Sequence, residues 1–269
     1  MAEADEGAVQ LIAGGAAMLG LSVLADSGME HYRGSFENPA MVLPLVASTL
    51  ELATNGRQGA GGAGGLVATA SHWSAAVVGA TGLGFHLYNI VKQPGGLRLN
   101  NLFYKAPVGA PAALILSGAL GAAAQALADG EGRIGPVDLG SGRALAAFAA
   151  VGIVGSVGEA ALLHFRGAYH NPAMWLPVAV PPLAAAALAV DAALGEPHRV
   201  TVVLLATTAV LGIAGVGFHA YGVRREMGGW RNWRQTLFSG PPLPAPPAFT
   251  GLAIAGLGAL LLIRRRAHG

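Results

Sequence analysis

The chain has 269 residues, of which 53% are apolar and only 11% are charged, and its formal net charge is +2. Soluble domains carry about a quarter charged residues, so these few charges do not cover a water-facing surface. The small net charge argues against nucleic-acid binding, and a sequence without cysteine excludes disulfides and thiolate metal sites. The composition predicts an all-α integral membrane protein in contact with the lipid bilayer.

Long apolar stretches follow one another along the chain. A helix needs about 20 apolar residues to cross the bilayer core, and eight stretches reach or approach that length. The predicted spans are 7–27, 38–55, 64–87, 107–128, 143–163, 172–193, 199–221 and 246–263. The second span contains Glu51 and the fifth contains Glu159. Residues 1–7 carry no basic side chain, so we do not expect a cleaved signal peptide.

The two halves of the chain share a sequence. The segment HYRGSFENPAMVLP at 31–44 recurs as HFRGAYHNPAMWLP at 164–177, and 164 minus 31 gives an offset of 133. The same offset places Gly84-Phe85-His86 on Gly217-Phe218-His219, and a two-residue insertion follows. We therefore predict two tandem four-helix repeats, residues 1–133 and 134–269. An even number of spans returns the chain to its starting side, so the repeats are expected to be parallel, with equivalent residues on one face.

The duplication separates repeated histidines from incidental ones. His72, His170, His198 and His268 have no histidine counterpart and are assigned no role. The other four end the first and third spans of each copy. Gly79 and Gly82 lie on the same helix stripe as His86, and this pattern predicts a flat slot of the kind that a porphyrin occupies. The predicted cofactor-binding residues are His31, His86, His164, His219, Arg33, Arg166, Arg98, Arg231, Gly82 and Gly215.

Imidazole side chains from two helices are typical ligands of haem iron, and the arginines lie where haem propionates would emerge. We expect the pairs His31–His86 and His164–His219 each to bind haem b. Pairing across the copies, for example His86 with His219, would instead place one haem on the pseudo-twofold axis. Another metal remains an alternative, as do interfacial histidines beside glycines that serve only close helix packing.

The loops at 88–106 and 222–245 are long, basic and aromatic, which favours docking of an extramembrane redox protein. The leading hypothesis is a non-catalytic electron-transfer subunit of a membrane oxidoreductase complex, with quinone as a further partner. Arg264-Arg265-Arg266 after the last span favours cytoplasmic termini in a bacterial inner membrane. The alternatives are a small-solute or ion transporter, with Asp26 and Glu159 at the repeat interface, and a membrane anchor without cofactor.

The segments Asn38-Pro39-Ala40 and Asn171-Pro172-Ala173 resemble the Asn-Pro-Ala boxes of aquaporins. Aquaporin boxes belong to a six-helix inverted repeat, whereas these follow the first span of each parallel copy. The spacing instead predicts a local role. Each asparagine caps a helix, and each proline takes the first helical position.

Overall fold

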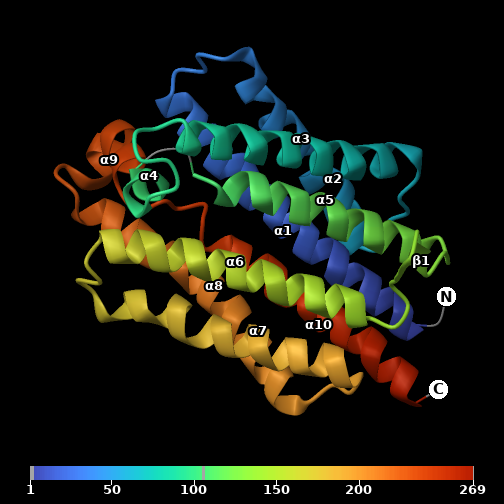
Figure 1. Cartoon of the computed structure of the whole chain (residues 1–269). Helices are drawn as coiled ribbons and strands as arrows, with labels where there is room; N and C mark the ends of the chain where they lie inside the picture. The colour runs from blue at the N-terminus through green and yellow to red at the C-terminus, as the bar shows by residue number, and fades with distance from the viewer. Residues whose placement is uncertain (1–2, 105–106, 269) are drawn as a thin grey trace.

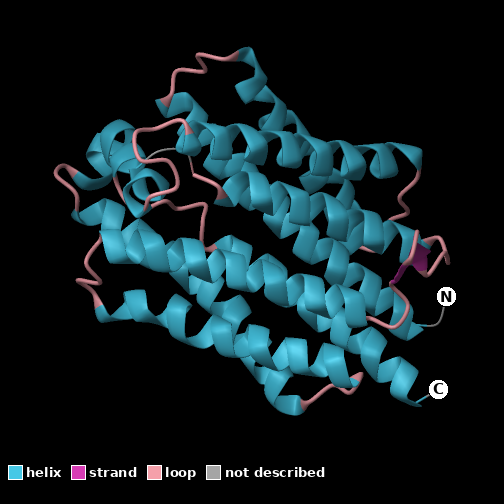
Figure 2. Ribbon diagram, in the orientation of Figure 1, coloured by secondary structure: helices cyan, strands magenta, loops and turns pink. Residues whose placement is uncertain are grey.

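A computed structural model describes residues 3–104 and 107–268, and most of these residues are helical (Figures 1 and 2). The first half contains α1 (Glu3–Arg33), the 3-10 turn η1 (Pro39–Val42), α2 (Leu43–Gly59), α3 (Leu66–Val91), α4 (Leu99–Tyr104) and α5 (Gly109–Ala128). A short antiparallel hairpin follows, formed by β1 (Arg133–Ile134) and β2 (Val137–Asp138). The second half contains α6 (Arg143–Arg166), η2 (Pro172–Trp175), α7 (Leu176–Leu194), α8 (Arg199–Arg225), η3 (Gly229–Asn232), α9 (Trp233–Ser239) and α10 (Pro247–His268).

Within the described residues, seven helices are long and apolar enough to cross a membrane: α1, α3, α5, α6, α7 with its preceding turn, α8 and α10. They support the prediction of an all-α, multi-pass membrane protein. The predicted second span is not among them. Its helix, α2, follows η1 directly and buries Glu51, Asn55 and Gln58, so this segment is more polar than the sequence prediction assumed.

The long helices form two neighbouring groups of four. In the first group α1 contacts α2 and α5, and α3 contacts the same two helices, so that α1 and α3 stand at opposite corners. In the second group α6 and α8 stand at opposite corners between α7 and α10. Figure 1 shows both termini and the β-hairpin at one end of the molecule, with the short helices α4 and α9 at the other. We call these the terminal end and the histidine end.

The two groups share one apolar core. Ile12 and Leu19 of α1 are fully buried against Leu252 and other residues of α10, and Ile153 and Leu188 of the second group belong to the same cluster. Lipid tails are as apolar as these side chains, so within a bilayer the core is stabilised by close van der Waals packing between the helices. The halves are therefore one structural unit rather than two separable domains.

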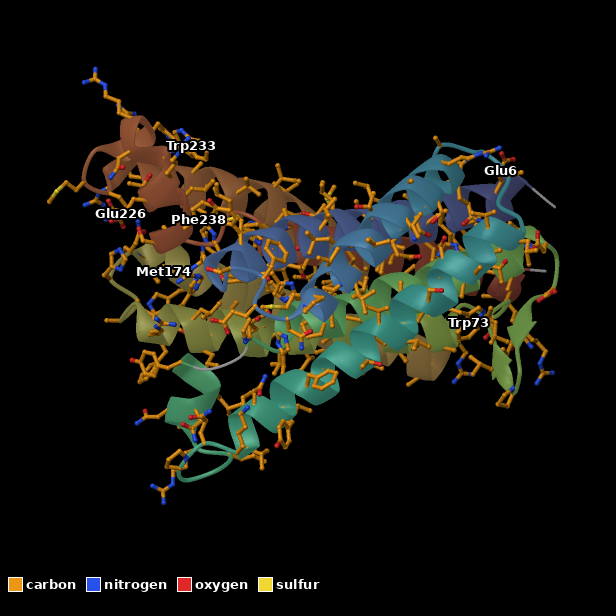
Figure 3. The ribbon with its side chains drawn as sticks, turned by 90° about the horizontal axis from the view of Figure 1, so that it is seen from above. Glu6, Trp73, Met174, Glu226, Trp233 and Phe238 are labelled. Atoms are coloured by element: carbon orange, nitrogen blue, oxygen red, sulfur yellow. The ribbon has the colours of Figure 1, made fainter. Side chains whose placement is uncertain are left out.

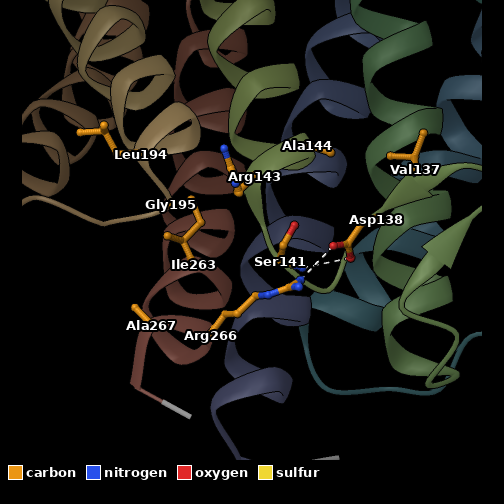
Figure 4. A pocket seen from close by; sticks show the side chains of 10 residues that line it. All are labelled: Val137, Asp138, Ser141, Arg143, Ala144, Leu194, Gly195, Ile263, Arg266 and Ala267. Carbon is orange, nitrogen blue, oxygen red and sulfur yellow. Dashed lines mark hydrogen bonds and ion pairs between the residues drawn. The ribbon is translucent and has the colours of Figure 1, made fainter.

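The β-hairpin ties the middle of the chain to the terminal end. Arg266 of α10 donates to Asp138 of β2 at 2.9 Å, beside a surface pocket that is also lined by Arg143 and Ser141 (Figure 4). Both members of the ion pair are largely exposed. An exposed pair of this kind contributes little to stability, so the hairpin is held mainly by its backbone and its buried neighbours.

The predicted helix caps are confirmed. The side-chain oxygen of Asn38 accepts from the backbone N–H of Ala40 at 2.9 Å, and Asn171 accepts from Ala173 at the same distance. A proline follows each asparagine at the start of η1 and η2. A cap satisfies an N–H group that has no acceptor within its own helix turn, so each box starts the chain segment that leads into α2 or α7.

Candidate functional site

The repeated histidines lie at corresponding places in the two halves. His31 and His164 lie in the last turns of α1 and α6, and His86 and His219 lie near the ends of α3 and α8. Figure 3 shows Met174, Trp233 and Phe238 at the histidine end and Glu6 at the opposite end. All four imidazoles are partly buried.

Each of these histidines is oriented by a backbone carbonyl. The Nδ1 atom of His31 lies 2.6 Å from the carbonyl oxygen of Met41, and that of His164 lies 2.7 Å from the oxygen of Met174. Both carbonyls belong to the 3-10 turns that follow the capping asparagines. The first histidine and the Asn-Pro-Ala-Met box of each copy are therefore parts of one local structure.

The second histidine of each copy bonds to a proline carbonyl in the loop before the fourth long helix. Nδ1 of His219 lies 2.6 Å from the oxygen of Pro242, and Nδ1 of His86 bonds to the oxygen of Pro107. A carbonyl oxygen only accepts, so the proton of a neutral ring must lie on Nδ1, which leaves a lone pair on Nε2. Metal-binding histidines are commonly oriented by this kind of bond.

The structure brings the histidines together within copies. His31 and His86 lie within electrostatic range of each other, as do His164 and His219. They come from opposite corners of their four-helix groups, α1 with α3 and α6 with α8. The two histidines of each pair therefore lie on opposite helices of one four-helix group, at its histidine end.

A strained turn follows the first histidine of each pair. Ser35 and Phe36 have φ of 54° and 48°, and Ala168 and Tyr169 have φ of 55° and 46°. The left-handed region is unfavourable for residues with a side chain, and such strain clusters at functional sites. The N–H groups of Phe36 and Tyr169 donate to the carbonyls of the two histidines, so the turn also fixes the histidine backbone.

The glycine stripe beside His86 faces another helix. A Cβ atom on Gly79 would lie 2.8 Å from the carbonyl of Pro111 in α5, and one on Gly82 would touch the Pro111 ring. The equivalents Gly212 and Gly215 meet Pro246 in the same way at the start of α10. Over these positions the small residues allow helices to approach closely, so the glycines have a packing role and the histidines alone mark the candidate site.

The four predicted arginines lie in different surroundings. Arg33 forms an ion pair with Glu30 at 2.7 Å, and Arg166 lies over the ring of Tyr104, 4.7 Å from its centroid. Arg98 and Arg231 are exposed at the histidine end. The Tyr104 contact joins α4 of the first half to α6 of the second, so the first predicted docking loop reaches across the junction; its residues 105–106 lie outside the described residues.

The second predicted docking loop crosses the junction in the opposite direction. Phe238 of α9 stacks on Tyr32 of α1 with centroids 5.0 Å apart. Trp230 and Trp233 of the same loop are about half exposed. The prolines at its end are engaged inside the molecule, since the carbonyls of Pro242 and Pro244 accept from His219 and Ser22.

The duplicated acids meet at the junction of the halves. Asp26 of α1 and Glu159 of α6 lie within electrostatic range of each other. Glu159 accepts from the backbone N–H of Gly109, the first residue of α5. A carboxylate at a helix N-terminus is favourably placed. With the two-residue insertion, the residue of the second copy that is equivalent to Gly109 is Pro244. A proline has no N–H group to donate to Asp26.

One polar cluster was missed by sequence reasoning. Glu51 of α2 and His72 of α3 are fully buried and bonded to each other, with 2.9 Å between Oε1 and Nδ1. His72 was assigned no role because it has no histidine counterpart across the duplication. Another feature of the sequence could have identified the pair. An acid and a histidine inside apolar spans are energetically costly and by themselves suggest a function.

Among the described residues, no group of three or more His, Asp or Glu side chains could hold a metal ion. The chain matches no protein-family model, no curated protein and no solved structure.

Proposed function

We propose that the protein is a membrane electron-transfer subunit that binds haem b through His31–His86 in the first copy and His164–His219 in the second. The observation that carries the proposal is the fourfold Nδ1–carbonyl bond, which leaves Nε2 of each ring with a lone pair. Two imidazoles on opposite helices are a ligand set that haem iron accepts. When bound, the haem would supply one-electron transfer; the protein would supply its ligands and their orientation.

The proposal includes the arrangement in the membrane. Eight helices cross or enter the bilayer as two parallel four-helix repeats, with α2 as the polar member among seven apolar spans. Parallel repeats place both histidine pairs at one membrane face. The arginine run 264–266 favours termini in the cytoplasm of a bacterial cell, with the histidine end on the other side of the inner membrane.

A redox partner is proposed to dock at the histidine end, on the loops 88–106 and 222–245. Leu97, Leu99 and Tyr104 are each more than half exposed, and Trp230 and Trp233 are about half exposed. Aromatic and apolar side chains beside arginines are typical of protein interfaces. A quinone is the expected second electron carrier, because a lipid-soluble carrier can reach the spanning helices from the bilayer.

A second candidate function is transport of an ion or small solute along the junction of the halves. The observation that favours it is the approach of Asp26 to Glu159, two acids on spanning helices. Uptake into liposomes that is lost in Asp26→Asn and retained in Glu30→Gln would support it.

A membrane anchor without cofactor is the third candidate, and it requires only the docking loops.

The test is an absorption spectrum of the full chain purified in detergent after expression with a haem precursor. We expect the bands of six-coordinate, low-spin haem, and their loss in His86→Ala combined with His219→Ala. His170→Ala is the matched control, since His170 is exposed at the same end and its ring is bonded only to the local Gly167 carbonyl at 3.0 Å. A colourless, iron-free protein that is folded would refute the proposal.

A further inference from the structure

The interior of the first four-helix group contains a line of polar side chains. On α2, Glu51, Asn55 and Gln58 are spaced as i, i+4 and i+7, which places them on one stripe. On α5, Ser117 and Gln125 flank Gly121 with the same kind of spacing. All five of these polar side chains are buried. The line therefore runs inside the group and not along its surface.

The deepest part of this line is the Glu51–His72 pair. Oε2 of Glu51 accepts from Asn55 at 2.8 Å and from the Ser117 hydroxyl at 3.4 Å, and Oε1 is bonded to His72. Nε2 of His72 and Oδ1 of Asn55 are fully buried and have no partner. A buried polar atom without a partner is costly, so the cluster leaves hydrogen-bonding capacity unused.

The second copy shows that the fold does not need these polar groups. The residues at the same positions are Ala184 for Glu51, Leu188 for Asn55, Leu205 for His72 and, with the two-residue insertion, Leu252 for Ser117. All four are fully buried, as are their polar counterparts. Buried charged pairs can often be replaced by apolar residues without loss of stability, and the second copy is such a replacement within one molecule.

The polar line reaches water at the terminal end. Gln58 lines a pocket of about 240 Å³ together with Glu6, Gln10, Ala63 and Asp129. Gln125 donates to Asp129 at 2.7 Å, and its own oxygen is buried without a partner, as are both polar atoms of Gln58. From this pocket, Asn55 and then Glu51 follow at successive turns of α2.

We propose that Glu51 and His72 form a proton-binding site inside the first four-helix group, loaded from the pocket at the terminal end. On loading, an O–H bond of a hydronium ion in the pocket breaks and a bond from that proton to the Glu51 carboxylate forms, which leaves water in the pocket and a neutral carboxyl group hydrogen-bonded to the neutral imidazole of His72. On release, the same O–H bond of Glu51 breaks and the proton returns to water in the pocket. This site is independent of the haem proposal, because it lies on other residues and opens at the other end.

The pair is surrounded by uncharged groups among the described residues. It faces Ala16 and Gly20 of α1, Asn55 of its own helix, and Ser117 and Gly121 of α5. Charged and histidine side chains on the same helices, and directly after α5, lie further along them: Glu6, Asp26, Glu30, His31 and Arg33 on α1, Arg57 on α2, His86 on α3 and Asp129 after α5. A change in proton occupancy is therefore a change in the charge of the pair itself.

The test is infrared difference spectroscopy of the full chain between acidic and alkaline buffer. We expect a carboxylic-acid C=O band that shifts in D₂O and is lost in Glu51→Gln. Asp191→Asn is the matched control, because Asp191 is an equally buried acid in the second copy, and this variant should keep the band. A folded Glu51→Gln protein with an unchanged band, or a wild type without one, would overturn the proposal.

A second variant keeps the test decisive if Glu51→Gln fails to fold. The combination of Glu51→Ala, Asn55→Leu, His72→Leu and Ser117→Leu copies the second half; it should fold and should lack the band. Loss of the fold would show that the cluster is structural and would contradict the proposal.

The entry route is tested by a variant of the pocket. Ala63→Trp should slow the response of the band to a pH jump, whereas Ala267→Trp, in the other pocket at this end, should not. Equal rates would contradict that route.

Discussion

Gly15 of α1 and Gly251 of α10 bring the backbones of the two halves into contact. A Cβ atom built on Gly251 would lie 2.7 Å from the carbonyl oxygen of Gly15, and one built on Gly15 would come closer still to the oxygen of Gly251. The corresponding positions at the other junction are Phe148 of α6 and Leu116 of α5. The contact between α1 and α10 therefore has small residues at these positions, whereas the contact between α5 and α6 has large ones.

Gly15→Ala should destabilise the protein by about 1–3 kcal/mol, because overpacking at a backbone contact forces the helices apart. Gly14→Ala is the matched control, since a Cβ there meets nothing within 4 Å. Thermal unfolding in detergent compares the two. Equal melting temperatures would show that α1 and α10 are not in close contact.

Asn171→Ala should destabilise the protein by about 1 kcal/mol, because it removes the acceptor for the N–H of Ala173. The loss should also disturb the Met174 carbonyl that orients His164. Asn171→Asp retains an acceptor oxygen and should restore most of the stability. Melting temperatures of the two variants that do not differ would contradict the capping role.

Arg143→Ala should lower the melting temperature more than Arg266→Ala. Arg143 donates to the carbonyls of Ala192 and Ala193 at 2.7 and 2.6 Å, where a cation also complements the dipole at the C-terminus of α7. Its loss should cost about 1 kcal/mol. Arg266 makes an exposed ion pair with Asp138, so its loss should cost about 0–1 kcal/mol. The opposite order would contradict this account.

The pKa of His198 is raised above its ordinary value of 6.5, because its side chain is hydrogen-bonded to Asp191 and attracted by that charge. The folded state thus favours the protonated ring. Its contribution to stability is complete below pH 6.5 and is lost as the pH rises through the raised pKa. The melting temperature of the wild type should fall over this range, and that of Asp191→Asn should fall less. Parallel curves would contradict the pairing.

The sequence predicts the seven spanning helices and the caps of the two Asn-Pro-Ala boxes, because both depend on local pattern. The bonds from His31 and His164 to the box carbonyls are seen only in the structure. Apolar length marks the seven spans, and the capping asparagines need only the residues next to them. The exact bounds differ: α1 ends at Arg33 rather than at residue 27, because a helix continues past charged residues that a hydropathy reading treats as its end.

Other features required three-dimensional contacts. Gly79 and Gly82 are predicted to border a porphyrin, yet α5 packs against this stripe of α3. Nothing in the sequence of α3 identifies the helix against which the stripe packs. The pair of Glu51 and His72 belongs to one copy, so repetition between the copies gives no signal for it. The two residues come from different helices, and their contact is seen only in the structure.

The haem content of single-copy variants tests the central claim most directly. We predict two haems per chain in the wild type, and one in each of two double variants, His31→Ala with His86→Ala and His164→Ala with His219→Ala. Pairing across the copies would instead give one haem in the wild type and none in either variant. Full haem content in both variants, or no haem in folded wild-type protein, would contradict binding by these four histidines.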